Sequence, residues 1–490
     1  MFQSFYLPIL IFLPLMIAGL IILPVLKNPI TIRKTVSIFS LIEVVISVLG
    51  YFLYSPNNNT LCKTVCDFSF FNDTLNNLGI NLKFGLDTLS VLMIILTTIL
   101  FYLAITISKL FIKHHHKLFY SLLLILETIL LAIFTVKDMF IFFVLWELEL
   151  VPMYFLISLW GNKKSKQAGL KFVLYTFGGS LFLLLGFLFI YYTNFAISGV
   201  MNTDITQLKM NNINPILQIL ITFLLLIGFG VKIPIVPLHR WLADTHTNST
   251  TPISMILAGI LLKLGIYSII RFNIGIVPLG FTFISPILGL LAIVNIIYGA
   301  TLAYSQTNIK RIVAYSSISQ MGIILLGLAS LTPTGYIGSV FHTLSHGFLA
   351  AGMFAIVGII KQKFGTGSIN RLSGIACVTP KLYGLSMIIL LGSVGIPFLS
   401  GFIGEFLTIY GAISSSVIII KLFGVIAFCV LILTALYILK LIHNVFMGLL
   451  PEKYNKVQDV AVHEFTVLGV ICFIAIILGC FPFIIVNFLS

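Results

Sequence analysis

Residues 214–238 decide the fold, and they read NPILQILITFLLLIGFGVKIPIVPL. The segment is apolar over a length that can span a bilayer, which takes about 20 residues. Near its end it is interrupted by glycine, lysine and proline, between Gly230 and Pro234. Unwound backbone and a charge are tolerated inside a membrane only where they line a wet cavity or are buried in protein. The stretch therefore predicts a broken transmembrane helix at a functional site.

The composition extends this interpretation to the whole chain. Hydrophobic residues make up 59% and charged residues 9% of the 490 residues, against roughly a quarter charged in an average soluble domain. A water-soluble protein of this length needs more charge to cover its surface. The net charge of +14 comes from basic residues scattered in the breaks between apolar runs. That scatter excludes the basic patch of a nucleic-acid-binding protein.

Apolar runs follow one another along the chain and predict an all-α polytopic membrane protein with fourteen spans. The first run is too long for the apolar core of a signal peptide, so it is expected to be the first span. No segment is long and polar enough for a soluble domain, and no glycine-rich phosphate-binding motif is present. We therefore expect this chain to bind no cofactor. The expected spans are residues 5–26, 35–54, 88–110, 118–136, 139–160, 169–192, 214–238, 252–270, 278–303, 312–331, 335–360, 382–412, 417–443 and 465–488.

Six cysteines are scattered along the chain, and only Cys62 and Cys66 are close in sequence. They lack further Cys or His partners for a zinc or iron–sulfur site, so no metal site is expected. Their position in the polar loop 55–83 leaves open a disulfide between them.

Lys and Arg residues are distributed unequally between the two sets of loops. Loops after odd-numbered spans hold 19 of them, whereas loops after even-numbered spans hold only Lys63, Lys83, Lys137, Lys209 and Arg271. Positive charge is retained on the cytoplasmic or matrix side of a membrane. The odd loops are expected to face that side, and both termini the opposite, outer side.

A weak internal repeat is visible in two interrupted segments. Gly230-Val-Lys-Ile-Pro234 and Ser393-Val-Gly-Ile-Pro397 each contain Gly and Pro, and their prolines stand at corresponding positions 163 residues apart. Broken helices in equivalent places of two halves indicate an ion or substrate site near the midplane. The alternative is a pair of proline kinks that serve packing alone.

Carboxylates inside the apolar runs are the first functional candidates, because each charge at a helix centre costs roughly 2.5–3.5 kcal/mol. Glu147 is near the middle of its span, and Glu127 is a second buried carboxylate in the span before it. Glu149 follows Glu147 by two residues, about 200° around a helix, so the two cannot share a face. Each could also be a hydrogen-bonded packing residue.

Two lysines are the basic candidates. Lys232 lies immediately before the Ile-Pro break, and His239 follows shortly after it. A buried ammonium loses proton affinity and a nearby carboxylate restores it, so such a lysine can be switched by moving its partner. Snorkelling toward the headgroups is the alternative for Lys232. Lys263 is deeper in its span, where snorkelling would be strained.

Glu405 follows the second interruption as Lys232 accompanies the first. His342 and His346 are four residues apart and share one helix face. That spacing suits zinc, but no HExxH glutamate and no third ligand are near. Histidines that titrate near neutrality fit a proton relay better, and a satisfied polar core residue is the alternative.

Several of these residues stand in strings that resemble the antiporter-like subunits of complex I, the respiratory NADH dehydrogenase. Within that group the resemblance is to the chain 4 type, called chain M in bacteria, and it covers about residues 85–445. The strings are Leu145-Trp-Glu147-Leu-Glu-Leu-Val-Pro-Met-Tyr-Phe, Val231-Lys-Ile-Pro-Ile-Val-Pro-Leu-His239-Arg-Trp-Leu, Ile256-Leu-Ala-Gly-Ile-Leu-Leu-Lys263-Leu-Gly, Lys310-Arg-Ile-Val-Ala-Tyr-Ser-Ser and Ser400-Gly-Phe-Ile-Gly-Glu405-Phe.

The resemblance implies a division of the chain and a set of roles. It implies two inverted five-helix repeats with helices seven and twelve broken, within N-terminal helices 1–84, repeats 85–275 and 276–445, and a C-terminal part 446–490. Glu147 would pair with Lys232, and Glu127 would be the carboxylate of helix four. Lys263 would pass protons along a hydrated axis with His346 as relay, ending at Glu405. His342 and His239 complete the candidate set.

The family also implies partners and cofactors. The partners would be other membrane-arm subunits of complex I, especially the neighbouring antiporter-like ones, and membrane lipids, without nucleic acid. NADH, FMN, iron–sulfur clusters and quinone would be bound by other subunits. Quinone reduction there would drive proton translocation here.

Two departures from the family pattern are visible. Gln320 stands where many relatives carry His, so one relay step would use water, His342 or His346. In the loop after Trp241, Ala243 and Asn248 replace a usual Pro and Glu. They concern helix-seven geometry and loop charge and leave the class unchanged.

Two other functions remain open on the sequence. A subunit of a multi-subunit sodium/proton antiporter resembles the same family and uses the same residues. A structural membrane spacer that no longer pumps is the third reading, and it predicts that Lys232 and Lys263 are dispensable. Few Gly and Ala against many Ile, Phe, Asn and Lys indicate an AT-rich genome, which favours the mitochondrial inner membrane over a bacterial plasma membrane.

Overall fold

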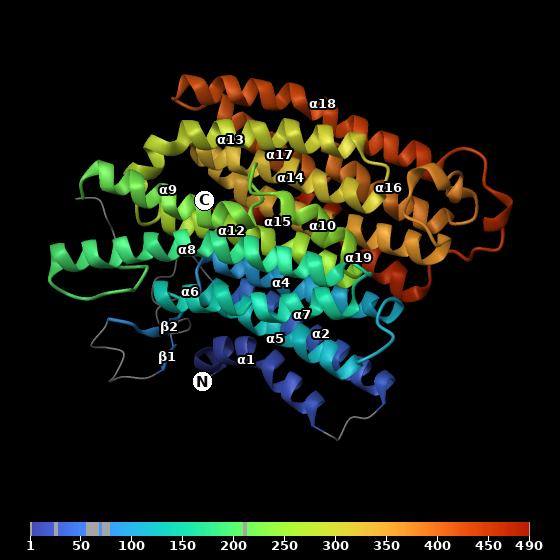
Figure 1. The fold of residues 1–490 in the computed structure, drawn as a ribbon, viewed down its shortest axis with the longest axis horizontal. Coiled ribbons are helices and arrows are strands. Elements are labelled where there is room, and N and C mark those ends of the chain that lie inside the picture. The colour runs from blue at the N-terminus through green and yellow to red at the C-terminus, as the bar shows by residue number, and fades with distance from the viewer. Residues whose placement is uncertain (1, 24–27, 55–67, 71–78, 209–212, 490) are drawn as a thin grey trace. The chain divides into compact units, whose positions relative to one another are not determined.

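The computed structural model describes residues 2–23, 28–54, 68–70, 79–208 and 213–489. Almost all of this described part is helical, as the apolar runs predict, and Figure 1 traces it from α1 to α19. Twelve helices in this part are long and apolar enough to cross a membrane, and three shorter apolar helices cover Tyr6–Ile22, Pro380–Val394 and Ser400–Ile413. The all-α membrane class is confirmed. The count of fourteen spans and the inverted repeats stay predictions.

Contacts divide the chain into two compact units. The first contains residues 1–105, 112–232 and 264–284, and the second contains residues 106–111, 233–263 and 285–490. The predicted boundaries at residues 84, 275 and 445 are not tested by this division, which follows packing instead of sequence repeats.

The helices of the first unit begin at residues suited to that position. Asn28 and Asp138 each accept a hydrogen bond from a backbone amide of the first turn, which caps α2 and α6. Within this unit α8 lies along α9, and α1 packs against α5 (Figure 1). The elements are α1 (Phe2–Ile22), α2 (Pro29–Leu53), α4 (Thr88–Ile107), α5 (His116–Thr135), α6 (Met139–Leu148), α7 (Leu150–Trp160), α8 (Ser165–Ser198), α9 (Pro215–Lys232), α12 (Leu262–Ser268) and η4 (Ile269–Ile274).

A small antiparallel ribbon adds the only paired strands in the described residues. β1 (Phe68–Phe70) pairs with β2 (Leu82–Phe84), with Phe68 opposite Phe84. Isolated bridges continue from Phe84 to Val136 and from Asp138 to Asp204. Cys62 and Cys66, and so the disulfide left open above, lie outside the described residues.

In the second unit α15 is the central helix, packed against α14 and α17 (Figure 1). Nearly all of its side chains from Gly338 to Ile360 are buried. The elements are η2 (Ser108–Leu110), α10 (Arg240–Asn248), α11 (Thr251–Ile256), η3 (Leu257–Leu261), α13 (Pro278–Ser305), α14 (Ile309–Ala329), α15 (Pro333–Phe364), η5 (Ile369–Arg371), η6 (Ile375–Cys377), α16 (Pro380–Val394), α17 (Ser400–Ile413), α18 (Ile418–Phe446), η7 (Glu452–Tyr454), α19 (Val462–Cys480) and α20 (Phe483–Leu489). Residues of α4, α12 and α13 contribute to both units.

Both predicted helix interruptions are present. α9 ends at Lys232, two residues before Pro234, which has no amide hydrogen to continue the helix. α16 ends at Val394, and Gly395 follows with φ +82, a left-handed conformation that favours glycine at a helix end. Each interruption leaves a helix end inside an apolar part of the chain.

Candidate functional site

A buried ion pair occupies the end of α9 in the first unit. The Lys232 ammonium contacts a carboxylate oxygen of Glu149, and both side chains are almost completely buried. The ammonium also lies 3.4 Å from the centroid of the Trp146 ring. Lys232 is the last residue of α9, where the helix dipole favours a positive charge. Three effects therefore support the cation at this position.

The break between α6 and α7 sets the position of Glu149. α6 ends at Leu148 and α7 begins at Leu150, so Glu149 is the junction residue. Trp146, one turn earlier, is held by an edge contact with Phe229 of α9 at 5.6 Å between centroids. The Trp146 ring and the Glu149 carboxylate, which both contact the Lys232 ammonium, thus come from the same short stretch of chain.

The expected pairing of Glu147 with Lys232 is wrong in this geometry, because Glu149 is the direct partner. Glu147 is half-buried and lies beside the exposed side chains of Val144 and Leu148, and Ser180 of α8 is its hydrogen-bond partner. The expectation that the two glutamates occupy different faces agrees with this arrangement. What the sequence could not show is which face turns inward, since that depends on the junction at residue 149.

Glu127 is fully buried in α5, as expected, and neither of its oxygens has a hydrogen-bond partner among the described residues. A carboxylate that the sequence reading overlooked, Glu43 of α2, is also buried, and the two charges interact. The signal for Glu43 was present: a single acid within the apolar run Leu41-Ile-Glu43-Val-Val.

Lys263 of the second unit has no ion-pair partner among the described residues. It is completely buried, and its ammonium lies 2.5 Å from the Ala258 carbonyl oxygen and 3.0 Å from Nδ1 of His346. Ala258 belongs to η3, a π-helical turn, in which backbone hydrogen bonds skip one residue further than in an α-helix. The Lys263 side chain thus reaches back five residues to a carbonyl oxygen of this irregular turn.

A chain of polar side chains continues from His346. The rings of His346 and His342 are stacked with centroids 6.2 Å apart. Nε2 of His342 lies 2.7 Å from the Gln320 side-chain oxygen, and the Gln320 amide donates to Glu405 at 2.9 Å. The structure thus brings together Lys263, His346, His342 and Glu405, four residues named from the sequence.

Gln320 therefore fills the gap that the sequence left open. Its side-chain oxygen lies within hydrogen-bond distance of the His342 ring. Its side-chain nitrogen donates to Glu405 and also to the Ser393 carbonyl oxygen, at 3.3 Å. An amide connects two groups by hydrogen bonds but does not take up and release a proton as imidazole does. Tyr437 of α18 lies beside Gln320 and Glu405, a neighbour that no sequence pattern indicated.

Two glycines make room for this chain. A methyl group on Gly404 would overlap the His342 side chain, and one on Gly395 would overlap a Glu405 oxygen. The Gly residues around the second interruption thus set how closely α15, α16 and α17 approach the polar groups.

His239 occupies a separate position. It immediately precedes α10, is buried, and makes an edge contact with Tyr298 at 5.1 Å between ring centroids. Hydrogen bonds join Lys263 to His346 and join His342 through Gln320 to Glu405, and the two histidine rings are stacked between them, so His239 is not one of these links.

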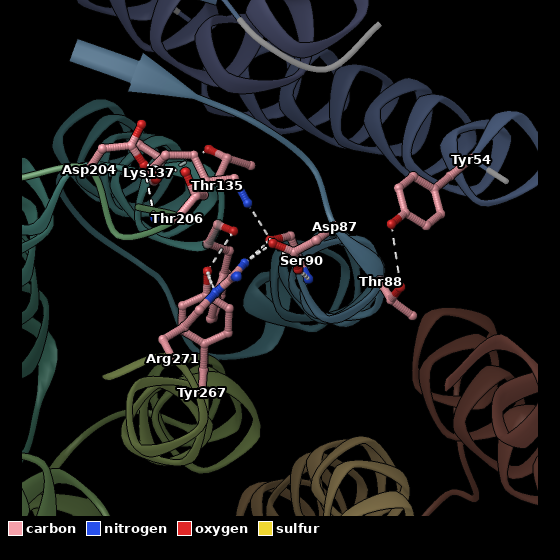
Figure 2. Close-up of polar contacts among 12 residues, drawn as sticks. Tyr54, Asp87, Thr88, Ser90, Thr135, Lys137, Asp204, Thr206, Tyr267 and Arg271 are labelled. Carbon is pink, nitrogen blue, oxygen red and sulfur yellow. Dashed lines mark hydrogen bonds and ion pairs between the residues drawn. The ribbon is translucent and has the colours of Figure 1, made fainter. Parts of the chain in front are cut away.

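A third polar group gathers around Asp87, which lies just before α4 and outside the membrane-spanning segments. Figure 2 shows Asp87 between Lys137, 2.5 Å away, and Arg271, with Ser90 beside them. Burial alone would raise the pKa of Asp87, but Arg271 and Lys137 hold it well below its usual range. A second ion pair joins Lys83 and Asp204 at 3.3 Å. The three cations that the sequence reading used only for topology are thus structural partners of carboxylates.

No group of three or more His, Cys, Asp or Glu in the described residues is placed to hold a metal ion. Cys377, Cys429, Cys472 and Cys480 are free thiols.

Comparison with known proteins supplies the family. A family described as NADH:quinone oxidoreductase/Mrp antiporter, transmembrane, matches residues 136–430. The chain is 38% identical over 419 residues to NAD(P)H-quinone oxidoreductase chain 4 3 of Trichormus variabilis, covering 83% of this chain and 76% of that one. It is 41% identical over 375 residues to chain 4 1 of a Picosynechococcus species, covering 76% and 69%.

Solved structures share the fold. A chain of respiratory complex I from Thermus thermophilus with bound NADH is 27% identical, with a TM-score of 0.87, and the alignment covers 99% of this chain and 97% of that one. A chain of the Mrp complex from Dietzia is 20% identical with a TM-score of 0.84, covering 99% and 96%, and shows a similar fold alone.

Proposed function

The chain belongs to the NADH:quinone oxidoreductase/Mrp antiporter transmembrane family, and from that premise we propose that it is the proton-translocating, chain-4-type membrane subunit of a respiratory NADH:quinone oxidoreductase. The similar chains of Trichormus and Picosynechococcus carry the chain 4 name. The observation that carries the proposal is a buried lysine with a proton-accepting partner in each of the two units.

In the first unit the switch is the ion pair of Lys232 and Glu149. While the two groups are in contact, the carboxylate stabilises the charged lysine. When they separate, each buried charge is left uncompensated, which is strongly unfavourable. Separation therefore favours transfer of the lysine proton to another acceptor. Glu147, close by on the other face of the segment, is available as a second carboxylate whose charge also acts on Lys232.

In the second unit the path starts at Lys263 and ends at Glu405. Lys263 hands a proton to His346, whose ring is already within hydrogen-bond distance. His342 continues the path, and Gln320 holds His342 and Glu405 in line without itself being protonated. Water linking His342 to Glu405 completes the transfer. Glu127 and His239 lie outside both proposed proton paths, and we propose them as accessory groups.

The energy for these steps comes from other subunits. NADH, FMN, iron–sulfur clusters and quinone are bound there, and the partners of this chain are the other membrane-arm subunits and lipid. Exposed apolar side chains along α8 and α18 are suited to such contacts, among them Leu174, Phe177, Phe428 and Ile432.

The protein is an integral multi-pass membrane protein. We propose that it acts in a bacterial energy-coupling membrane, because the relatives named above are cyanobacterial. They do not support the mitochondrial inner membrane that the AT-rich composition favoured. Both termini are proposed to face the outer side, as the distribution of Lys and Arg predicts.

A subunit of a sodium/proton antiporter is the second candidate, favoured by the structural similarity to the Mrp complex. Purification from the native membrane separates the two. We expect the chain to co-purify with flavin and iron–sulfur subunits. We also expect NADH oxidation by the reconstituted complex to change the pH of the vesicle lumen in the absence of sodium. Co-purification with antiporter subunits alone, and sodium-dependent proton movement without NADH, would replace the proposal by the antiporter.

A further inference from the structure

Two buried carboxylates in the first unit belong to neither the Lys232 ion pair nor the Lys263 chain. Glu43 is in the middle of α2, 14 residues after Pro29 and 10 before Leu53, and Glu127 is 11 residues after the start of α5 at His116. At about 1.5 Å per residue, both lie at least 12 Å from either helix end. Both side chains are at most 1% exposed, α2 packs on α5, and the two charges interact.

Among the described residues no cation contacts the pair. The helices α1, α4, α6 and α7, which contact α2 or α5, contain no Lys, Arg or His, and their titratable groups are tyrosines and Glu147. α12 also contacts α5, through Tyr267 and Phe134, and its Lys263 ammonium is hydrogen-bonded to Ala258 and lies against His346 instead. On α2 and α5 themselves the basic residues are confined to the first two turns, at Arg33, Lys34, His116 and Lys117. Two carboxylates that share one desolvated site cannot both remain ionised.

The oxygens of the pair are free to take a small ligand. Neither oxygen of Glu127, nor Oε1 of Glu43, has a hydrogen-bond partner in the described chain. Neighbouring hydroxyls are already engaged: Ser47 with Thr98 at 2.7 Å, and Thr128 with the Leu124 carbonyl at 3.1 Å. A metal cation takes several oxygen ligands, whereas a proton needs two.

We propose that Glu43 and Glu127 are a proton-holding pair, in which one protonated carboxyl group donates a hydrogen bond to the other carboxylate. The pair is a proton site between α2 and α5, separate from the two lysine sites. It depends on the charge state of this chain alone and stands whether or not the complex pumps through Lys232 and Lys263.

Polar side chains follow Glu43 on the same face of α2 toward its end. Ser47 and Tyr54 follow Glu43 by 4 and 11 residues, which is about 40° and 20° around the helix, so all three share a face. Ser47 bonds Thr98, and the Tyr54 hydroxyl lies 3.4 Å from Thr88, the residue after Asp87 (Figure 2). The face of α2 between the pair and Asp87, on the predicted outer side, thus carries polar groups.

Infrared difference spectroscopy on the chain in its native complex tests the proposal. We compare wild type with Glu43→Gln, Glu127→Gln and the double variant at pH 7, and look for the C=O band of a protonated carboxyl group that shifts in heavy water. The expected result is a band present in wild type, shifted in each single variant and lost in the double variant. Glu452→Gln, an exposed carboxylate, is the control and leaves the band unchanged.

Wild type labelled with ¹³C at the glutamate side-chain carboxyl provides a second measurement that needs no substitution. The band must shift on labelling, and it must persist when sodium is added at neutral pH. A double variant whose spectrum equals wild type, or a wild-type spectrum with no such glutamate band, overturns the proposal. A band that disappears on adding sodium also overturns it and assigns a cation site. None of these readouts uses proton pumping, so they are independent of the proposed function.

Discussion

The two buried lysines differ in what stands opposite the ammonium. Lys232 in the first unit touches the Glu149 carboxylate and lies over the Trp146 ring. Lys263 in the second unit contacts a carbonyl oxygen and an imidazole. The carboxylate of this polar chain, Glu405, comes after two stacked histidines and Gln320. The same residue type thus forms a closed pair in one unit and begins an open chain in the other. The first arrangement suits a switch, and the second suits conduction.

The helix ends at the two interruptions show the same contrast. In the repeat alignment Lys232 corresponds to Gly395, both at the end of a broken helix. A positive side chain occupies the first helix end, and the Glu405 carboxylate occupies the space beside Gly395 at the second. The negative end of a helix dipole stabilises the former and opposes the latter. Equivalent breaks are therefore used for opposite charges.

Removing one partner of the closed pair gives the largest expected effect on stability. Glu149→Gln leaves a buried ammonium without its carboxylate and should lower the free energy of unfolding by about 3–5 kcal/mol. The double variant Glu149→Gln/Lys232→Met should recover most of that loss without recovering proton pumping. Thermal unfolding in detergent measures the first effect and vesicle acidification the second.

Glu147→Gln is the matched control for that experiment. Because Glu147 is half-buried beside exposed residues, its effect on unfolding should stay within about 0.5 kcal/mol. If Glu147→Gln is the more destabilising of the two, the pairing of Lys232 with Glu149 is wrong and the original expectation from the sequence is restored.

Breaking the open chain should have an intermediate effect. Gln320→Leu leaves His342 and Glu405 without a buried partner, at a combined cost of roughly 2–3 kcal/mol. Gln320→His restores both hydrogen bonds with a group that can carry a proton, so pumping should equal or exceed wild type. A Gln320→Leu variant with unchanged stability and pumping would show that the chain does not run through this amide.

The smallest effect is expected at Asp87, which belongs to neither the two lysine sites nor the two helix ends compared above. Asp87→Asn should destabilise the protein by about 1 kcal/mol, since the carboxylate is partly exposed. Because the folded protein lowers the pKa of Asp87, this contribution is present above the unfolded pKa and is lost as pH falls through the folded value. The difference between wild type and variant should therefore be constant at neutral pH and shrink only below about pH 4. A difference that shrinks between pH 8 and 6 would contradict the assignment.

Charges inside apolar runs made most of the site predictable from the sequence. Lys232, Lys263, His342, His346 and Glu405 stood out because few charged residues occur in such runs. The Gly and Pro residues at 230–234 and 393–397 located both helix interruptions for the same backbone reasons that the structure displays. These signals depend only on residues that are close in the sequence, so they can be recognised without the structure.

What could not be predicted depends on contacts between helices. Glu149, and not Glu147, is the partner of Lys232 because it lies at the junction of α6 and α7. The spacing of apolar residues does not show which of the two glutamates turns inward there. The bridging position of Gln320 requires α14, α15 and α17 to meet. The π-helical turn that contains Ala258, the carbonyl partner of Lys263, has no sequence motif of its own. Glu43 could have been found by the charge criterion and was missed.

Proton uptake and NADH–quinone turnover, measured together in the reconstituted complex with Lys263→Met, test the central claim most directly. Met keeps the length and apolar packing of the side chain but cannot carry a proton. The account predicts loss of most proton translocation by this chain, with quinone turnover reduced in parallel by roughly tenfold if coupling is tight. Normal turnover together with normal proton uptake would contradict it.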